Sequence, residues 1–253
     1  MREPKRALVT GAYQGLGRAM ADQLDAQGYD VTTIDRSRMP VDAPFHHHTC
    51  DLSNRAEVDA LIDVLAREDA FDVLVFNAGI SATGKFEEIE PDAHARVMEV
   101  NAVAPITLCA ALMANRKISD GAKIGFVSSL SHFTGYPGAA SYGASKDAIA
   151  IYAKSVGKVW KKSKGISVTT AFPGPLRTEH AARHAPEGAD ADKRMAPAEA
   201  AKLILKDVLA GKPKSLPGGG AKVFAFVGHL APSLITKAMR KIIYEKLDKR
   251  VED

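Results

Sequence analysis

Short apolar runs alternate with amphipathic helical patterns through most of the 253 residues, and no other feature constrains the fold as much. Residues 7–10 form the first apolar run, residues 15–27 carry a helical stripe that stops at Gly28, and residues 31–34 form the second run. Strands separated by helices need crossover connections, which favour a parallel sheet covered on both faces. The sequence therefore predicts an α/β fold with a doubly wound, Rossmann-type parallel sheet.

The same patterns predict the remaining elements and the domain organisation. Further strands are expected at residues 49–50, 73–76, 123–128, 166–171 and 223–227. Further helices are expected at residues 55–67, 92–113 with a bend at Pro105, 141–162, 197–210 and 232–249. Because no repeat or low-complexity linker divides the chain, residues 1–253 are predicted to form one domain. Residues 179–196 are expected to be a substrate loop, and residues 230–253 a C-terminal helical extension.

A glycine-rich turn lies between the first predicted strand and the first predicted helix, in the run Thr10-Gly11-Ala12-Tyr13-Gln14-Gly15-Leu16-Gly17. Glycines let a backbone turn tightly and approach a pyrophosphate, and a helix N-terminus offers free amides and a favourable dipole. The turn is therefore predicted to bind a dinucleotide, with a plain βα turn as the alternative. The candidate cofactor-binding residues here are Gly11, Tyr13, Gln14, Gly15, Leu16 and Gly17.

An acidic residue, Asp35, ends the second predicted strand. A carboxylate there accepts hydrogen bonds from the adenosine ribose and repels a 2′-phosphate, which favours NAD over NADP. Arg36 could turn toward such a phosphate, so NADP stays possible. The pair Asp51-Leu52 is a candidate contact to the adenine, the alternative being an ordinary turn before a helix capped by Ser53 or Asn54.

Tyr142 and Lys146 lie four residues apart in a predicted helix and so share one face. A nearby ammonium favours the phenolate and lowers the pKa of a phenol, which would give a proton donor and acceptor usable near neutral pH. Such a pair also occurs on ordinary solvated helix faces, so it indicates catalysis only in combination with other motifs.

Several motifs occur in a characteristic order: residues 10–17, Asn77-Ala78-Gly79, Asn101, Ser129, the Tyr142–Lys146 pair and Pro173-Gly174. With this order the chain resembles the short-chain dehydrogenase/reductase family, in its single-domain subgroup, over roughly residues 5–178. The resemblance implies reversible hydride transfer between nicotinamide C4 and the carbon of an alcohol or ketone. From Glu179 onward the likeness is architectural only.

The resemblance also implies roles for individual residues. Asn101, Ser129, Tyr142 and Lys146 match the catalytic tetrad. Tyr142 would be the general acid/base, Ser129 would donate a hydrogen bond to the substrate oxygen, and Lys146 would bind the nicotinamide ribose and lower the tyrosine pKa. The Asn101 main chain would complete a proton relay. Further implied cofactor contacts are Asn77, Ala78, Gly79, Pro173, Gly174, Leu176 and Thr178.

Two rival functions remain open beside this one. A nucleotide-sugar epimerase or dehydratase of the extended relatives also uses Tyr-x-x-x-Lys, but the glycine spacing and the chain length argue against it. A noncatalytic NAD-binding regulator is the second rival, and the complete tetrad argues against it.

Composition limits the location and the partners. The formal net charge of +4 indicates neither nucleic-acid nor membrane binding, and no stretch reads as a signal peptide or membrane span. Cys50 and Cys109 show no pairing or metal motif, so a reducing, cytoplasmic location is expected. No metal is predicted, because the adjacent His46, His47 and His48 alternate in direction on a strand. The expected partner is a small alcohol or carbonyl substrate, and the family implies a homodimer or homotetramer.

Residues near the substrate end leave alternatives open. His132, Phe133 and Tyr136 could line the cleft or pack beneath a loop. Arg177, His180, Arg183 and His184 could form a cationic lid for an acidic substrate or simply an exposed loop. An apolar stripe over residues 234–247 could cap the cleft, bury against the core or meet another subunit.

Overall fold

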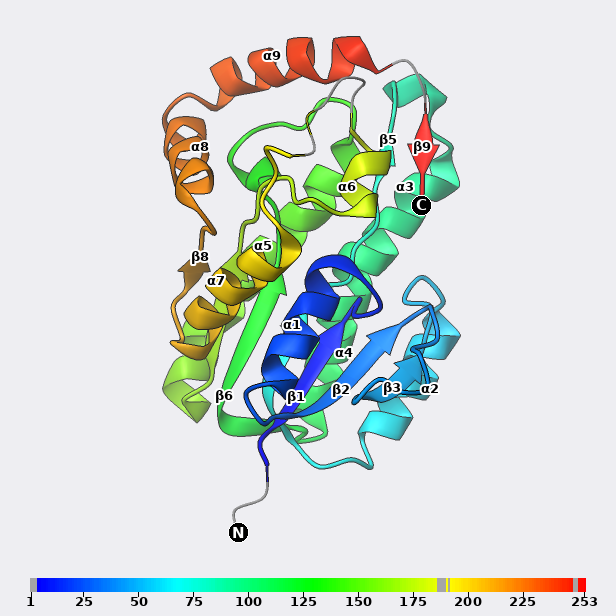
Figure 1. Cartoon of the computed structure of the whole chain (residues 1–253), viewed down its shortest axis with the longest axis vertical. Helices are drawn as coiled ribbons and strands as arrows, with labels where there is room; N and C mark the ends of the chain where they lie inside the picture. Colours follow the sequence, from blue (N-terminus) through cyan, green and yellow to red (C-terminus); the bar gives the residue numbers. More distant parts are fainter. Residues whose placement is uncertain (1–3, 186–189, 191, 248–249) are drawn as a thin grey trace.

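A seven-stranded parallel sheet forms the centre of the molecule, with helices on both of its faces (Figure 1). The computed structural model describes residues 4–185, 190, 192–247 and 250–253. The sheet has the order β3-β2-β1-β4-β6-β7-β8. Its strands are β1 (Arg6–Thr10), β2 (Asp30–Asp35), β3 (His46–Thr49), β4 (Phe71–Phe76), β6 (Ile118–Val127), β7 (Ser167–Ala171) and β8 (Lys214–Ser215). The predicted doubly wound fold is confirmed.

The two largest core clusters lie on opposite faces of the sheet. Along β1, side chains alternate between the faces. Val9 packs with Met20 and Ile204 on one side, whereas Leu8 packs with Leu108 on the other. The helices are α1 (Gly15–Asp25), α2 (Arg55–Leu65), α3 (Pro91–Met98), α4 (Ala104–Ala114), α5 (Ala140–Lys164), α6 (Glu179–Arg183), α7 (Pro197–Leu209), α8 (Gly219–Leu230) and α9 (Pro232–Ile242).

The predicted strand at residues 223–227 is wrong, because this segment belongs to helix α8. The residues that α8 buries are small, Ala221, Ala225 and Gly228, whereas Val223 and Phe226 are 64% and 66% exposed. The last strand of the sheet is instead β8, which is only two residues long and pairs with β7.

The predicted helix at residues 92–113 is interrupted rather than bent at its proline. A π-helical segment, Glu99–Val103, separates α3 from α4. Pro105 lies in the first turn of α4, where a missing N–H costs little. By length and composition the stretch Pro91–Ala114 could cross a membrane, but half of its most apolar window is buried inside the protein, as in a core helix.

The last predicted helix, residues 232–249, is also too long. Helix α9 ends at Ile242, and a short 3₁₀ turn, Tyr244–Lys246, follows it. Residues 248–249 lie outside the described part of the chain. Strand β9 (Val251–Glu252) then pairs antiparallel with β5 (Ala82–Thr83), beside α3 (Figure 1).

The three adjacent histidines form most of strand β3 rather than an approach to it. Each binds a different partner. His46 contacts Asp30 at 3.1 Å, His47 contacts the Ser37 carbonyl at 3.0 Å, and His48 contacts Glu68 at 2.9 Å. The three rings therefore do not converge on one point.

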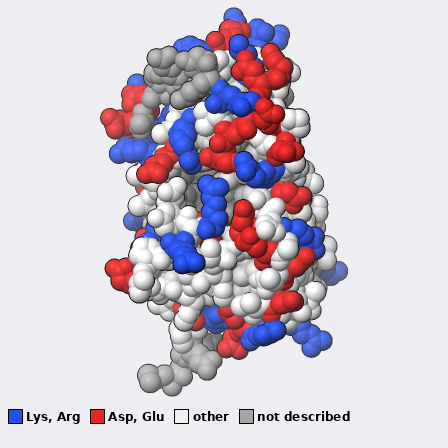
Figure 2. Space-filling view, turned by 90° about the vertical axis from the view of Figure 1, so that its right-hand side faces the viewer, with Lys and Arg blue, Asp and Glu red and all other residues white. Residues whose placement is uncertain are grey.

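Charges of both signs are intermingled over the face shown in Figure 2. A nucleic-acid-binding face typically carries a basic patch or stripe instead. On this face the charge distribution gives no support to nucleic acid as a partner.

Candidate active site

One cleft of about 1160 Å³ opens at the carboxyl ends of the central strands, where ligands of doubly wound sheets bind. It brings together nearly all of the predicted site residues. Two predicted residues, Gly17 and Asn101, do not line the cleft themselves. The predicted residues that line it are Gly11, Tyr13, Gln14, Gly15, Leu16, Asp35, Arg36, Asp51, Leu52, Asn77, Ala78, Gly79, Ser129, Tyr142, Lys146, Pro173, Gly174, Leu176 and Thr178.

The glycine turn at the start of α1 has no room for side chains. A Cβ on Gly17 would lie 2.0 Å from the Gly11 carbonyl oxygen, and Gly11 and Gly15 have φ values of +67° and +63°. Gln14, the residue before α1, makes no side-chain capping bond. The first amides of α1 therefore have no side-chain cap, and the bare backbone beside them suits a phosphate group.

Asn77 holds this turn in place. Its side-chain amide donates to the carbonyl oxygens of Thr10 and Gly11, at 3.1 Å each. The Thr10 hydroxyl accepts in turn from the main-chain amides of Asn77 and Ala78, at 3.0 Å each. The side chain predicted to contact the cofactor thus also ties the end of β4 to the loop after β1.

Asp35 lies at the end of β2 and braces the same loop. Its two carboxylate oxygens accept from the amides of Tyr13 and Ser37, both at 3.0 Å. An ionised carboxylate has about four acceptor positions, so capacity for ribose hydroxyls remains. Arg36 is exposed at the rim.

Asp51 takes part in the turn that precedes α2. Its Oδ1 accepts from the Ser53 hydroxyl at 2.7 Å, and Asn54 caps the helix. Both Asp51 and Leu52 also line the cleft. Both interpretations of this pair therefore apply: Asp51 and Leu52 belong to a turn before a capped helix, and they also line the cleft.

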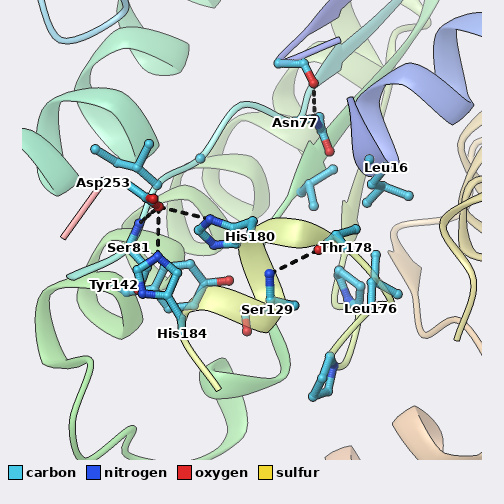
Figure 3. A pocket seen from close by; sticks show the side chains of 18 of the residues that line it. Leu16, Asn77, Ser81, Ser129, Tyr142, Leu176, Thr178, His180, His184 and Asp253 are labelled. Atoms are coloured by element: carbon cyan, nitrogen blue, oxygen red, sulfur yellow. Dashed lines mark hydrogen bonds and ion pairs between the residues drawn. The ribbon is translucent and has the colours of Figure 1, made fainter. Parts of the chain in front are cut away.

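Tyr142 and Lys146 share one face of α5 and line the cleft. Ser129, which comes shortly after β6, lies near Tyr142 in the same cleft (Figure 3). The Lys146 Nζ lies 5.8 Å from the centre of the Tyr142 ring and donates to the Val127 carbonyl at 3.0 Å. Burial lowers the pKa of Lys146 to about 8.

The expectation of a lowered tyrosine pKa is wrong for the protein in this state. Burial raises the pKa of Tyr142 to about 12, although a hydrogen bond with Ser129 opposes the shift. Desolvation disfavours the phenolate more than that bond stabilises it. The phenol is therefore protonated at neutral pH, which makes it a proton donor.

Asn101 lies in the π-helical segment and is buried behind the cleft wall. Its side chain accepts from the Ile80 amide at 2.8 Å and donates to the Ile80 carbonyl and the Ser145 hydroxyl, both at 2.9 Å. A Cβ on Gly79 would lie 2.9 Å from the Lys146 Nζ and 3.3 Å from the Asn101 Oδ1. Gly79 therefore lets the lysine, the asparagine and the loop after β4 approach one another.

Neighbouring polar residues divide between packing and the cleft. Ser128 donates to the Lys146 carbonyl at 2.8 Å, which anchors α5 to β6. Ser131 and Tyr136 line the cleft. His132 instead stacks on Phe172 and binds Asp147, and Phe133 packs against the same aromatic ring.

Three of the four residues proposed as a cationic lid surround a carboxylate of the same chain, that of Asp253. In Figure 3 the rings of His180 and His184, from α6 and the residue after it, turn toward the Asp253 carboxylate. Their nitrogens lie 3.0 and 2.9 Å from its Oδ2, and Arg183 lies 3.1 Å from its Oδ1. Arg177 points elsewhere, toward main-chain oxygens at residues 192 and 194.

Sequence reasoning missed the cleft residues Ser81 and Asp253. Asp253 directly follows strand β9, and no local sequence pattern predicts the pairing of that strand with β5. Helix α9 also contributes Met239, and Ile243 follows it, so the apolar stripe does reach the cleft. His180, His184 and Asp253 have side chains of metal-ligating types with ligand atoms within 4.8 Å of one another.

The doubly wound sheet and its glycine turn define a dinucleotide-binding protein of the Rossmann type. The family model for short chain dehydrogenases matches residues 5–188, and the chain belongs to that family. It is an oxidoreductase acting with a nicotinamide cofactor on an alcohol or carbonyl substrate, as the sequence predicts.

Individual relatives agree with this assignment. The chain is 31% identical to a 3beta-hydroxysteroid dehydrogenase of Mediterraneibacter gnavus, over 85% of this chain and 82% of that protein. A short-chain dehydrogenase from Streptomyces avermitilis superposes with a TM-score of 0.77 at 26% identity, covering 95% and 97% of the two chains. One from Burkholderia cenocepacia, in complex with NADP, has a TM-score of 0.76 at 24% identity, covering 94% and 97%.

Proposed function

We propose that this chain interconverts an alcohol and a ketone with NAD(H), and that Tyr142 transfers the proton. The observation that carries the proposal is the arrangement of Tyr142, Ser129 and Lys146 in one cleft with the glycine turn. Tyr142 and Ser129 line the same cleft, and the buried lysine lies beside the phenol ring.

The cleft has the parts that a nicotinamide dinucleotide requires. The amides at the start of α1 and the bare backbone at Gly11 and Gly17 suit a pyrophosphate, and Asp35 suits the adenosine ribose. Leu176 and Thr178 lie across from the turn, since a Cβ on Gly15 would meet the Thr178 methyl at 3.3 Å. When bound, the cofactor supplies or accepts the hydride at the substrate carbon.

Side chains of the protein transfer the proton and stabilise the substrate oxygen. In reduction, Tyr142 gives its phenolic proton to the substrate oxygen as the carbonyl carbon gains hydride, and in oxidation the proton returns to the phenolate. Ser129 donates a hydrogen bond to the same oxygen and stabilises the charge that develops there. The pKa of Tyr142, raised by burial to about 12, suits the donating direction.

Lys146 supplies positive charge next to the phenol. Its ammonium, together with the positive ring of an oxidised cofactor, would lower the pKa of Tyr142 and so favour the oxidative direction. Asn101 positions the lysine by holding the loop around Ile80 and Gly79 against α5. We assign it a positioning role for its side chain and keep the proton relay as a role for its main chain.

Replacing Tyr142 with Phe tests this assignment. The variant keeps the ring and loses the proton, so we expect kcat to fall about 10²- to 10⁴-fold while NADH binding changes little. Initial rates over an alcohol and ketone panel and NADH fluorescence titration measure the two effects. Tyr136→Phe is the matched control, because Tyr136 lies on the same cleft and its ring packs against Tyr142. Equal turnover in Tyr142→Phe and the wild type would sink the assignment.

Cofactor choice is proposed as NAD, with Asp35 as the discriminating group. A relative of the same fold was solved with NADP, but at 24% identity that likeness extends to the fold alone. We expect NADH to bind at least about tenfold more tightly than NADPH, and Asp35→Ser to reduce that ratio. Fluorescence titration with both cofactors decides the matter, and tighter NADPH binding by the wild type would overturn the choice.

The assembly and location remain proposals as well. We infer a homodimer or homotetramer in the cytoplasm, with the helices around Asn101 and Tyr142 at the interface. Ile151 and Val159 on α5 are 55% and 63% exposed, as a helix that meets a second copy would be. Sedimentation of the wild type and of Val159→Lys measures this, and a monomeric wild type would contradict it.

A further inference from the structure

The carboxylate of Asp253 is enclosed by nitrogen donors, two from histidines and one from an arginine, inside the proposed active-site cleft, and the two histidines are seen in Figure 3. The Asp253 side chain is 2% exposed. His180, Arg183 and His184 contact its two oxygens at 2.9 to 3.1 Å, and the Ser81 amide donates to Oδ2 at 3.2 Å. These four donors surround a single carboxylate.

Two of the donors, His184 and the Ser81 amide, are positioned by contacts other than those to Asp253. The His184 Nδ1 side is hydrogen-bonded to the Thr83 hydroxyl, which leaves Nε2 to carry a proton toward Asp253. His184 is 7% exposed, whereas Arg183 is half exposed and approaches from the rim. Ser81 lies between Ile80, which Asn101 holds by two hydrogen bonds, and Ala82, which is buried in an apolar cluster, so its amide is held by contacts that do not involve β9.

This cluster lies on the same side of the cleft as the proposed acid/base. Tyr142 packs against a small apolar cluster that includes Ala82 and Val97. Ala82 directly follows Ser81, whose amide holds Asp253. A substrate whose carbonyl faces Tyr142 can therefore extend toward the cationic donors.

Apart from the Asp253 carboxylate, the segment that delivers Asp253 is held mainly by exposed contacts, including Arg250 to the Glu88 carbonyl at 2.6 Å and the Glu90 amide to Glu252 at 3.2 Å. Strand β9 is two residues long and pairs only with β5. Arg250 contacts Glu90 at 3.0 Å in an exposed pair, and Arg96 donates to the Asp253 main-chain oxygen at 2.6 Å. Exposed pairs of this kind contribute little to stability, so the buried contacts of the Asp253 carboxylate are the main restraint, and an incoming carboxylate that takes over the same contacts offsets their loss.

We propose that His180, Arg183, His184 and the Ser81 amide form a carboxylate-binding subsite, which Asp253 fills until the carboxylate of a keto or hydroxy acid displaces it. The inference rests on the proposed function, since it names the substrate class of the same cleft. In reduction of the keto acid, hydride goes to the carbonyl carbon and the Tyr142 proton to its oxygen, while the carboxylate stays ionised in the subsite.

A zinc site formed by the same residues is the less favoured interpretation. The histidine nitrogens lie at hydrogen-bond distance from Asp253, and Arg183 would repel a cation.

A binding test that needs no turnover uses acetate and the variant Asp253→Ala. With the internal carboxylate gone, acetate at about 50 mM is expected to raise the Tm of the variant by about 3 °C, against less than about 1 °C for the wild type. Acetamide is the matched neutral probe and should have no effect. Adding Arg183→Gln to the variant should abolish the acetate response. Glu252→Gln, which alters a carboxylate on the same strand outside the subsite, should behave like the wild type.

A second measurement compares keto acids with their methyl esters, starting from 4-oxopentanoate. Asp253→Ala is expected to raise kcat/KM for the acid relative to the ester at least about tenfold, and Glu252→Gln to leave the ratio unchanged. Acetate and acetamide acting alike, or an unchanged acid-to-ester ratio, would overturn the subsite. So would a Tm increase of the wild type with Zn²⁺ that His184→Ala removes. Because the acetate response does not depend on Tyr142, its failure is distinguishable from a failure of the proposed function.

Discussion

At the scale of single residues, burial decides how Lys146 and Tyr142 share protons. The Lys146 side chain is almost fully buried with one carbonyl partner, and the Tyr142 phenol lies beside it in the cleft wall. Burial disfavours the charged form of both groups, which lowers one pKa and raises the other. Without cofactor, the protein therefore holds a neutral phenol next to an ammonium group whose pKa is lowered to about 8.

A pH-dependent stability difference follows from Lys146. Its pKa is about 8 in the folded protein, whereas an unfolded lysine titrates near about 10.4. From pH 8 to 10 the unfolded chain binds the proton that the folded chain has lost, so rising pH favours the folded wild type. Relative to Lys146→Met, we expect the free energy of unfolding to gain at most about 1.4 kcal/mol per pH unit. Below pH 8 the difference between the two proteins should be constant.

Urea unfolding of both proteins at pH 7, 8, 9 and 9.5 measures this difference. The Tyr142 pKa of about 12 lies above the range, so the phenol stays protonated throughout. A difference that does not change between pH 8 and 9.5 would contradict the burial of the ammonium. Lys158→Met on the same helix, at an exposed position, should show no such trend.

The common helix face of Tyr142 and Lys146 was predictable, but the environment of their side chains was not. The spacing of Tyr142 and Lys146 on one helix predicts their common face, and the structure shows it. The spacing does not show that a phenol is desolvated, because that depends on Ala82 and Val97 from other elements. The direction of the tyrosine pKa shift was therefore wrong although the pair itself was correctly placed.

At the scale of elements, the start of α1 is the most restrictive part of the site. A methyl group on Gly17 would collide with the Gly11 carbonyl, which is backbone and has no freedom to turn aside. Gly17→Ala should therefore distort the turn, weaken NADH binding at least about tenfold and lower the Tm. NADH fluorescence titration and thermal unfolding measure the two effects.

Gly220→Ala is the matched control for this change. Gly220 lies in α8 with open space around its position, and its substitution should leave NADH binding unchanged and raise stability by up to about 1 kcal/mol. NADH binding by Gly17→Ala as tight as that of the wild type would show that the turn tolerates a side chain, against the prediction.

Element boundaries were predictable where burial follows the usual pattern. Strands β1 and β4 are apolar runs, and strands β2 and β7 combine valine with buried threonine; each was placed correctly to within a few residues. Helix α8 inverts the pattern, because it buries alanine and glycine and exposes Val223 and Phe226. A run of large apolar residues then resembles a strand. The π-helical segment at residues 99–103 has no period of its own to detect.

At the scale of the whole molecule, contacts between distant parts of the chain limit what the sequence predicts. The cationic residues of α6 were identified as a possible lid for an acidic substrate. Their partner Asp253 lies 69 residues after His184 and reaches it only because β9 pairs with β5. Patterns within one segment carry no information about such a pairing.

The shared sheet should make the protein unfold as one unit. Its two faces support separate core clusters, and β1 contributes Leu8 to one and Val9 to the other. Loss of either cluster exposes a face of the same strands, so we expect one cooperative thermal transition.

Because the cofactor cleft lies along the carboxyl edge of that sheet, NADH should stabilise the entire unit. At 100 times its Kd, NADH should add about 2.7 kcal/mol and raise the Tm by about 5 to 10 °C. Differential scanning calorimetry with and without NADH measures this, and Gly17→Ala at the same NADH concentration should show a smaller increase of Tm. Two separate transitions, of which NADH moves only one, would contradict a single unit and indicate that the clusters on the two faces of the sheet melt independently.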